Sequence, residues 1–130
     1  MIKTNKTYTR LDYHIVFGTK YREQSIDNEI ISRVRDCAKE KAEELGFLVH
    51  IVNGYKDHIH ILMTLPPKYA VAHIVKHIKG YSSRMIEGLR WQNGYSAFTV
   101  DESSFDRVFQ YIKMQQKDHE EEEDTHDFPA

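Results

Sequence analysis

With 130 residues, 40% of them hydrophobic, and a formal net charge of −2, the chain has the size of one domain and too much apolar material for a disordered protein. No uncharged apolar run approaches the ~20 residues that span a bilayer, the N-terminus lacks a secretory signal, and a single cysteine excludes a disulfide framework or a multi-cysteine zinc site. We therefore expect a soluble, cytoplasmic, single-domain protein with no membrane partner.

Charge is distributed unevenly along the chain. All 18 Lys and Arg residues lie in residues 1–117, which carry a net charge of +5, whereas residues 118–130 carry −7 and include four consecutive Glu. We therefore predict one domain over residues 1–117, followed by an acidic C-terminal tail over residues 118–130. The mildly basic domain permits a polyanionic partner without requiring one, and the tail would repel nearby DNA phosphates at low salt.

The hydrophobic pattern predicts a mixed fold. We expect strands over 13–19, 47–55, 58–65 and 95–100, helices over 26–45 and 70–89, and a third helix from about residue 105 into the acidic tail. A tight turn at 56–57 joins the second and third strands. This order predicts an α+β, ferredoxin-like (split β-α-β) antiparallel sheet with helices packed on one face, plus a C-terminal helix.

The strand predicted over residues 58–65 carries the sharpest chemical feature, His58-Ile-His60. Side chains alternate along a strand, so both imidazoles point to the same face and could grip a divalent metal. The alternative is an ordinary polar strand face. His14 and His50 lie in other strand-like runs, where hydrogen-bonded structural histidines are more typical than metal ligands.

A second feature lies in the predicted C-terminal helix. Tyr111 and Gln115 are four residues apart and therefore share one helix face. The Gln115 amide oxygen is a hard ligand compatible with Mg²⁺ or Mn²⁺, and the Tyr111 phenol could attack a phosphoester. The alternative is a packed aromatic residue beside a solvated glutamine.

Taken together, these segments resemble the single-tyrosine HUH transposases of the smallest bacterial insertion sequences (the TnpA, IS200-like family). The resemblance extends over about residues 8–117. It includes Tyr13-His-Ile-Val-Phe-Gly-Thr-Lys-Tyr-Arg22, Asp57-His-Ile-His-Ile-Leu62, Pro66-Pro67, Ile78-Lys-Gly-Tyr-Ser-Ser-Arg84, Trp91, Gly94-Tyr-Ser-Ala-Phe-Thr-Val100 and Tyr111-Ile-Lys-Met-Gln115. The sequence departs from the family after residue 117, where members continue with a further helical segment and this chain becomes acidic.

The resemblance implies an enzyme that cleaves and rejoins single-stranded DNA with hairpin-bearing ends, without a nucleotide cofactor. It implies that His58, His60 and Gln115 hold Mg²⁺ or Mn²⁺, and that Tyr111 forms a 5′-phosphotyrosine intermediate. It also implies a homodimer in which the tyrosine helix of one subunit faces the histidine pair of the other, although spacing alone does not distinguish this from a site within one chain.

The expected DNA contacts are less sharply marked by the sequence. The segment around Gly80 combines cations and hydroxyls that suit phosphate, at Lys79, Ser82, Ser83 and Arg84. Arg10 and Arg22 could also reach DNA. Each of these residues is equally compatible with ordinary surface charge or helix packing.

Two other functions remain open from the sequence alone. A domesticated relative on the same sheet could bind single strands or hairpins without catalysis. A metal-dependent phosphodiesterase could release free DNA ends without a covalent tyrosine link.

Overall fold

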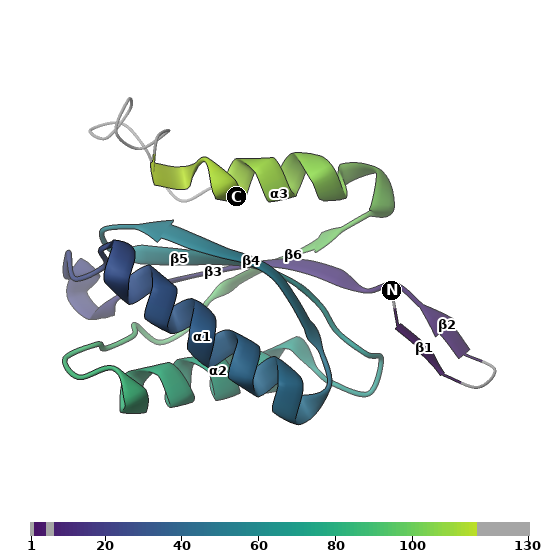
Figure 1. Cartoon of the computed structure of the whole chain (residues 1–130), viewed down its shortest axis with the longest axis horizontal. Coiled ribbons are helices and arrows are strands. Elements are labelled where there is room, and N and C mark those ends of the chain that lie inside the picture. Colours follow the sequence, from purple (N-terminus) through teal and green to yellow (C-terminus); the bar gives the residue numbers. More distant parts are fainter. Residues whose placement is uncertain (1, 5–6, 117–130) are drawn as a thin grey trace.

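The computed structural model describes residues 2–4 and 7–116 and shows one sheet between two helical layers (Figure 1). The acidic tail at 118–130 lies outside the described residues. The strands are β1 (Ile2–Thr4), β2 (Thr7–Thr9), β3 (Asp12–Gly18), β4 (Leu48–Tyr55), β5 (His58–Thr64) and β6 (Ser96–Val100); the α-helices are α1 (Asn28–Leu45), α2 (Val71–Met85) and α3 (Phe105–Lys113), with 3₁₀ turns at Lys20–Arg22 and Glu102–Ser104.

The main sheet has the strand order β4-β5-β3-β6, and every neighbouring pair is antiparallel. With α1 after β3 and α2 after β5, the chain follows the predicted ferredoxin-like order. The fold prediction is therefore confirmed. The short β1–β2 hairpin, which projects from one end of the molecule in Figure 1, was not predicted.

The two faces of the sheet bury different material. Helices α1 and α2 cover one face, whereas α3 lies across the other (Figure 1). The larger core lies under α1 and α2, and its central side chains come from alternate residues of β3 and β5. A smaller cluster under α3 centres on Leu62, Val100 and Ile112. Strand β5 is thus buried on both sides, which explains why all seven of its residues are buried, the polar ones included.

Local sequence signals fix the helix ends. The side chain of Asp27 accepts a hydrogen bond from the Ile30 amide at 2.8 Å, so α1 begins two residues later than the hydrophobic pattern predicted. It ends at Gly46, whose φ of 82° suits glycine. Helix α2 continues through Gly80 and ends at Met85, four residues before the predicted boundary. None of the helices in the described part of the chain is long and apolar enough to cross a membrane.

At Gly54, strand β4 lies too close to the histidine-bearing strand β5 to leave room for a side chain. Gly54 pairs with Ile59, and a Cβ built on Gly54 would collide with the His58 carbonyl oxygen and lie 3.1 Å from the Ile59 Cα. These obstacles are backbone atoms, which cannot rotate away. A glycine is therefore required here by space and not by its φ angle.

We predict that Gly54→Ala lowers the free energy of unfolding by about 1–3 kcal/mol, because the added methyl group overpacks the β4–β5 pair. Gly80→Ala is the matched control. Its Cβ would meet only the Arg84 guanidinium at 3.6 Å, so it should stabilise α2 by up to ~1 kcal/mol. Urea denaturation measures both, and a Gly54→Ala protein as stable as the wild type would contradict the steric account.

Candidate active site

The site lies between β5 and α3. Along β5, Ile59 and Ile61 enter the larger core, so His58 and His60 point to the opposite face, under α3. Both imidazoles are buried, with exposed fractions of 3% for His58 and 0% for His60. The predicted pairing of the two rings on one face is confirmed by their centroid separation of 5.1 Å.

Helix α3 places the ring of Tyr111 beside His60 of the pair and beside His14. The ring centroid of Tyr111 lies 5.8 Å from that of His60 and 6.1 Å from that of His14, in edge-on arrangements. Tyr111 therefore lies beside two histidines of its own chain in this structure. The alternative of a packed aromatic residue is also partly correct, since Tyr111 contacts the small cluster under α3.

Gln115 follows the end of α3 and is fully buried. Its amide nitrogen donates to the Tyr111 carbonyl oxygen at 3.2 Å, which fixes the glutamine one turn beyond the tyrosine. The side chain also comes close enough to His58 to influence the pKa of that imidazole. Gln115 is thus not the solvated residue of the alternative interpretation, and it joins the histidine pair.

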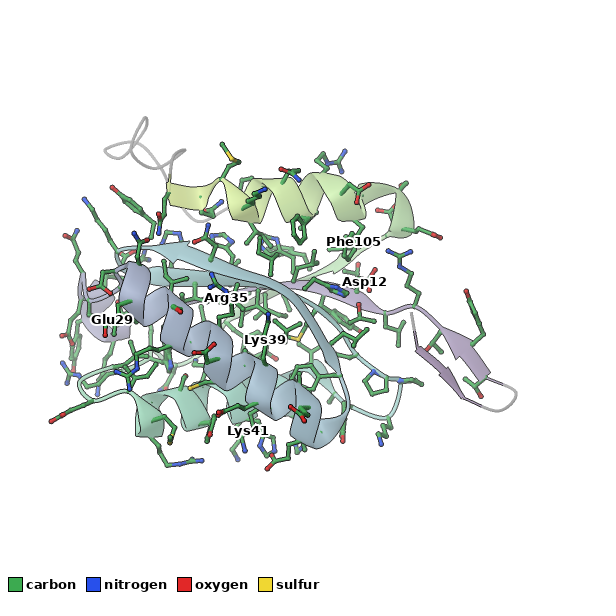
Figure 2. All side chains as sticks on the ribbon, in the orientation of Figure 1. Asp12, Glu29, Arg35, Lys39, Lys41 and Phe105 are labelled. Atoms are coloured by element: carbon green, nitrogen blue, oxygen red, sulfur yellow. The ribbon has the colours of Figure 1, made fainter. Side chains whose placement is uncertain are left out.

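Asn53 of β4 secures the end of α3 above the site. Its amide nitrogen donates to the carbonyl oxygens of Ile112 at 3.0 Å and Lys113 at 3.1 Å. These are among the carbonyls that a helix end leaves without partners in the helix. The other end of α3 is held by Phe105, which packs edge-on against His50 and beneath Arg10 (Figure 2).

Each imidazole of the pair makes a hydrogen bond through Nδ1. His58 Nδ1 lies 3.0 Å from Asp57 Oδ1, and His60 Nδ1 lies 2.9 Å from His14 Nε2. The prediction that His14 is a hydrogen-bonded structural histidine is thereby confirmed. His50 is confirmed in the same way by its 2.7 Å contact with the Thr64 hydroxyl.

Burial dominates the electrostatics of the site. It lowers the pKa of His14 to about 4 and also lowers the pKa of His58, although Asp57 and Gln115 oppose the shift at His58. Burial alone would raise the pKa of Asp57. Hydrogen bonds from Arg22 and His58 outweigh that effect and hold the pKa below its usual value. Burial thus favours the neutral forms of His14 and His58, whereas the hydrogen bonds favour the ionised form of Asp57.

The residues expected to contact DNA divide among three places. Arg10 forms ion pairs with Asp12 and Glu102, at 2.9 and 3.0 Å, and Arg22 forms one with Asp57 at 3.0 Å. The other four lie on α2, on the opposite face of the sheet from α3. The structure therefore does not gather all six into one patch.

On α2, Lys79 and Ser82 are engaged by the protein itself. The Lys79 ammonium donates to the carbonyls of Gln92 and Gly94, at 2.7 and 2.8 Å, and burial lowers its pKa. Ser82 is fully buried, donates to the Ile78 carbonyl and accepts from the Trp91 indole. Ser82 is therefore a packing residue in this fold, because no surface of its hydroxyl remains for DNA.

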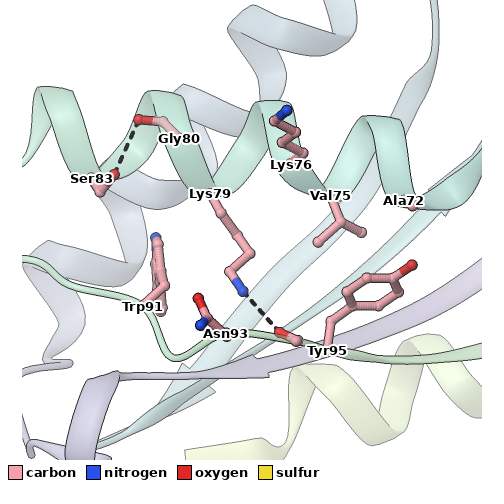
Figure 3. A pocket seen from close by; sticks show the side chains of 10 residues that line it. Ala72, Val75, Lys76, Lys79, Gly80, Ser83, Trp91, Asn93 and Tyr95 are labelled. Carbon is pink, nitrogen blue, oxygen red and sulfur yellow. Dashed lines mark hydrogen bonds between the residues drawn. The ribbon is translucent and has the colours of Figure 1, made fainter.

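Ser83 and Arg84 lie nearer the surface. The Ser83 hydroxyl donates to the Gly80 carbonyl at 3.1 Å, and Arg84 is exposed, with its guanidinium over the Tyr81 ring. Beside Ser83, α2 and residues 91–95 line an open surface cavity of about 400 Å³ (Figure 3). Its wall includes Trp91 and Tyr95. No local sequence pattern predicts this cavity, because its two sides come from separate parts of the chain.

Two neighbours of the histidine pair were not assigned to it from the sequence: Asp57 was not singled out, and Arg22 was expected only as a DNA contact. Asp57 directly precedes His58, and Arg22 precedes it by more than thirty residues. The adjacency of Asp57 to His58 was a usable signal, since a carboxylate beside an imidazole commonly orients the ring. The partnership of His14 with His60 depends on strand order, which no local pattern reveals.

Comparison with known proteins agrees with this architecture. A family model described as "Transposase IS200 like" matches residues 7–115. The chain belongs to this family of transposases.

The chain is similar to two named transposases. The ISDra2 transposase TnpA of Deinococcus radiodurans is 28% identical over 118 residues, which cover 82% of this chain and 84% of the relative. The transposase for insertion sequence element IS200 of Salmonella typhimurium is 32% identical over 115 residues, covering 79% of this chain and 75% of the relative.

Solved structures share the fold. A Deinococcus radiodurans crystal structure assigned as a transposase superposes with a TM-score of 0.69 at 27% identity, covering 88% of this chain and 98% of that one. A REP-associated tyrosine transposase bound to a REP hairpin gives a TM-score of 0.68 at 14% identity, covering 92% and 74%. At that identity the second match shows the fold alone.

Burial of neutral His14 predicts a pH dependence of stability. With a pKa of about 4 in the folded protein and 6.5 as its ordinary value, His14 binds a proton more readily in the unfolded chain. The free energy of unfolding should therefore fall as the pH drops from 6.5 towards 4, by up to roughly 3 kcal/mol from this residue. His14→Gln should show a shallower fall in urea denaturation between these pH values, and an unchanged pH slope would contradict the assignment.

Proposed function

We propose that the protein is a metal-dependent transposase that cleaves and rejoins single-stranded DNA through a 5′-phosphotyrosine link. The observation that supports this most directly is the convergence, within one chain, of Tyr111 and Gln115 on the buried pair His58 and His60. Membership of the IS200-like transposases supports the same activity.

The donor atoms suit a divalent cation. In the described residues, no group of three or more His, Cys, Asp and Glu could hold a metal, so we propose the Gln115 amide oxygen as the third ligand beside the two imidazoles. Because Nδ1 of each ring makes a hydrogen bond, the buried Nε2 atoms are the nitrogens that would ligate. This neutral set fits Mg²⁺ or Mn²⁺, either of which also binds phosphate oxygens and water. When bound, the ion would supply Lewis acidity to the scissile phosphate.

The chain's own residue for the covalent step is Tyr111. Its phenolic oxygen attacks phosphorus, the bond between phosphorus and the 3′ oxygen breaks, and the phenolic proton is lost while the departing oxygen gains one. The reverse attack by a 3′-hydroxyl releases the phenol and restores the phosphodiester. A phenol, with a pKa near ~10, is a better leaving group than an alkyl alcohol, so the link stores the bond energy for rejoining.

We also propose that the protein acts as a homodimer and recognises hairpins at the element ends. The bound hairpin in the REP-associated relative supports this choice of DNA. Lys79 and Ser83 lie on α2 beside the cavity and form, with Arg84 of the same helix, the proposed phosphate-binding surface. Arg10 and Arg22, near opposite ends of β3, are further candidates.

The phosphotyrosine step predicts the behaviour of Tyr111→Phe. Incubated with Mn²⁺ and single-stranded DNA from the flanks of the native locus, the wild type should form a covalent band in denaturing gels, and Tyr111→Phe should form none. DNA affinity should change by less than about threefold, because phosphate contacts dominate it.

Tyr8→Phe is the matched control for this experiment, because Tyr8 is 61% exposed on β2 and remote from the histidine pair. It should form the adduct at the wild-type level. An adduct in Tyr111→Phe would remove the phenol from its role. Hairpin binding by a wild type that forms no adduct would instead indicate a non-catalytic binder, and steady turnover without an adduct would indicate a phosphodiesterase.

The metal assignment predicts the effect of replacing either imidazole. His58→Ala and His60→Ala should each weaken Mn²⁺ binding by at least about tenfold and abolish the adduct, because each removes a proposed ligand. Titration calorimetry measures the affinity. His73→Ala, on the exposed side of α2, should match the wild type. Cleavage by either β5 variant at ordinary metal concentration would exclude the pair as ligands.

A further inference from the structure

The imidazoles of His58 and His60 each form a hydrogen bond with a residue that is not one of the proposed metal ligands. Asp57 Oδ1 lies 3.0 Å from His58 Nδ1, and His14 Nε2 lies 2.9 Å from His60 Nδ1. His14 is 7% exposed, and both partner rings are more deeply buried. A buried imidazole has two tautomers, and its hydrogen-bond partner selects between them.

At His58 the chemistry of the partner fixes the direction of the bond. An ionised carboxylate only accepts hydrogen bonds, so the His58 ring must donate from Nδ1. Its proton then resides on Nδ1, and its lone pair resides on Nε2. This is the tautomer that a metal ligand bound through Nε2 requires.

Asp57 is itself held from a second side. Its Oδ2 accepts from Arg22 Nε at 3.0 Å, and its backbone carbonyl accepts from the Thr19 amide at 2.9 Å. Arg22 reaches Asp57 from a turn in which Tyr21 and Arg22 both have positive φ angles, 57° and 54°. Residues other than glycine rarely adopt positive φ angles. The surrounding structure therefore has to hold this turn in the conformation that presents the Arg22 guanidinium to Asp57.

At His60 the partner is another imidazole. His14 is on the neighbouring strand β3, two residues before Val16, which pairs with His60. The rings of Tyr111 and Phe98 pack against the His14 ring. A neutral imidazole can accept through Nε2, and His14 Nε2 lies 2.9 Å from His60 Nδ1. His60 then donates from Nδ1 and keeps its lone pair on Nε2, as His58 does.

We propose that Asp57 and His14 are positioning residues that hold His58 and His60 in the Nδ1–H tautomer, so that both Nε2 atoms present lone pairs before any metal arrives. This inference rests on the proposed function, because it assigns a role to the neighbours of the proposed ligands. Arg22 acts one step further out by orienting the Asp57 carboxylate.

The direct test is nitrogen-15 NMR of the histidine rings in the full chain without metal. The wild type should show both His58 and His60 as Nδ1–H tautomers. Asp57→Ala should shift His58 towards the Nε2–H tautomer and leave His60 unchanged, whereas His14→Ala should do the reverse. Asp57→Asn has one acceptor oxygen where Asp57 has two, and the Arg22 guanidinium competes for it. Its NH2 group then faces His58 Nδ1, so this variant should also shift His58 towards the Nε2–H tautomer.

Metal affinity provides a second readout that does not depend on DNA cleavage. Asp57→Ala and His14→Ala should each weaken Mn²⁺ binding about 10–100-fold, measured by electron paramagnetic resonance. Asp57→Asn should show a similar loss, because its single acceptor oxygen is shared with Arg22. His50→Gln is the matched control, since His50 bonds Thr64 and not the histidine pair, and it should keep the wild-type affinity.

The proposal is overturned if His58 in the wild type is an Nε2–H tautomer, or if folded Asp57→Ala and Asp57→Asn both bind Mn²⁺ like the wild type. Circular dichroism shows which variants are folded. If Asp57→Ala does not fold, Asp57→Asn alone is used for the measurement of Mn²⁺ affinity. Failure of the proposed function gives a different pattern: His58→Ala would leave Mn²⁺ binding unchanged, while the tautomers of the wild-type rings would still report whether Asp57 and His14 orient them.

Discussion

The site depends on the burial of strand β5 on both of its faces. Residues that alternate along this strand enter the core under α1 and α2 or the layer under α3, and none of the seven is exposed. Two imidazoles on such a strand are removed from water, where unpartnered polar atoms cost several kcal/mol. The surrounding polar groups are therefore a requirement of the fold as well as a means of orienting the rings.

The polar groups come from distant parts of the chain. Asp57 is supplied by the turn before β5, His14 by the adjacent strand β3, and Gln115 by the end of the C-terminal helix. The Asn53 side chain binds the last carbonyls of α3 and so keeps Tyr111 beside His60. Packing of α3 on the sheet thus couples the position of the phenol to that of the histidines.

Much of this arrangement follows from the sequence. The strand alternation at His58 and His60 and the four-residue spacing of Tyr111 and Gln115 predicted which side chains share a face. The structure retains these strand and helix periodicities because packing of β5 and α3 against the rest of the fold favours the same faces. The residues that orient the site were harder to identify: His14 meets His60 only once β3 lies beside β5, and Arg22 reaches Asp57 through a turn with unusual φ angles. The burial of Ser82 depends likewise on the indole of Trp91.

The account is tested most directly by locating the metal. Crystals of the protein grown with Mn²⁺ and examined by anomalous scattering should show one strong peak bonded to Nε2 of His58, Nε2 of His60 and the side-chain oxygen of Gln115, with the Tyr111 ring beside it. A manganese peak held by other residues, with these imidazoles bound to no metal, would contradict the central claim.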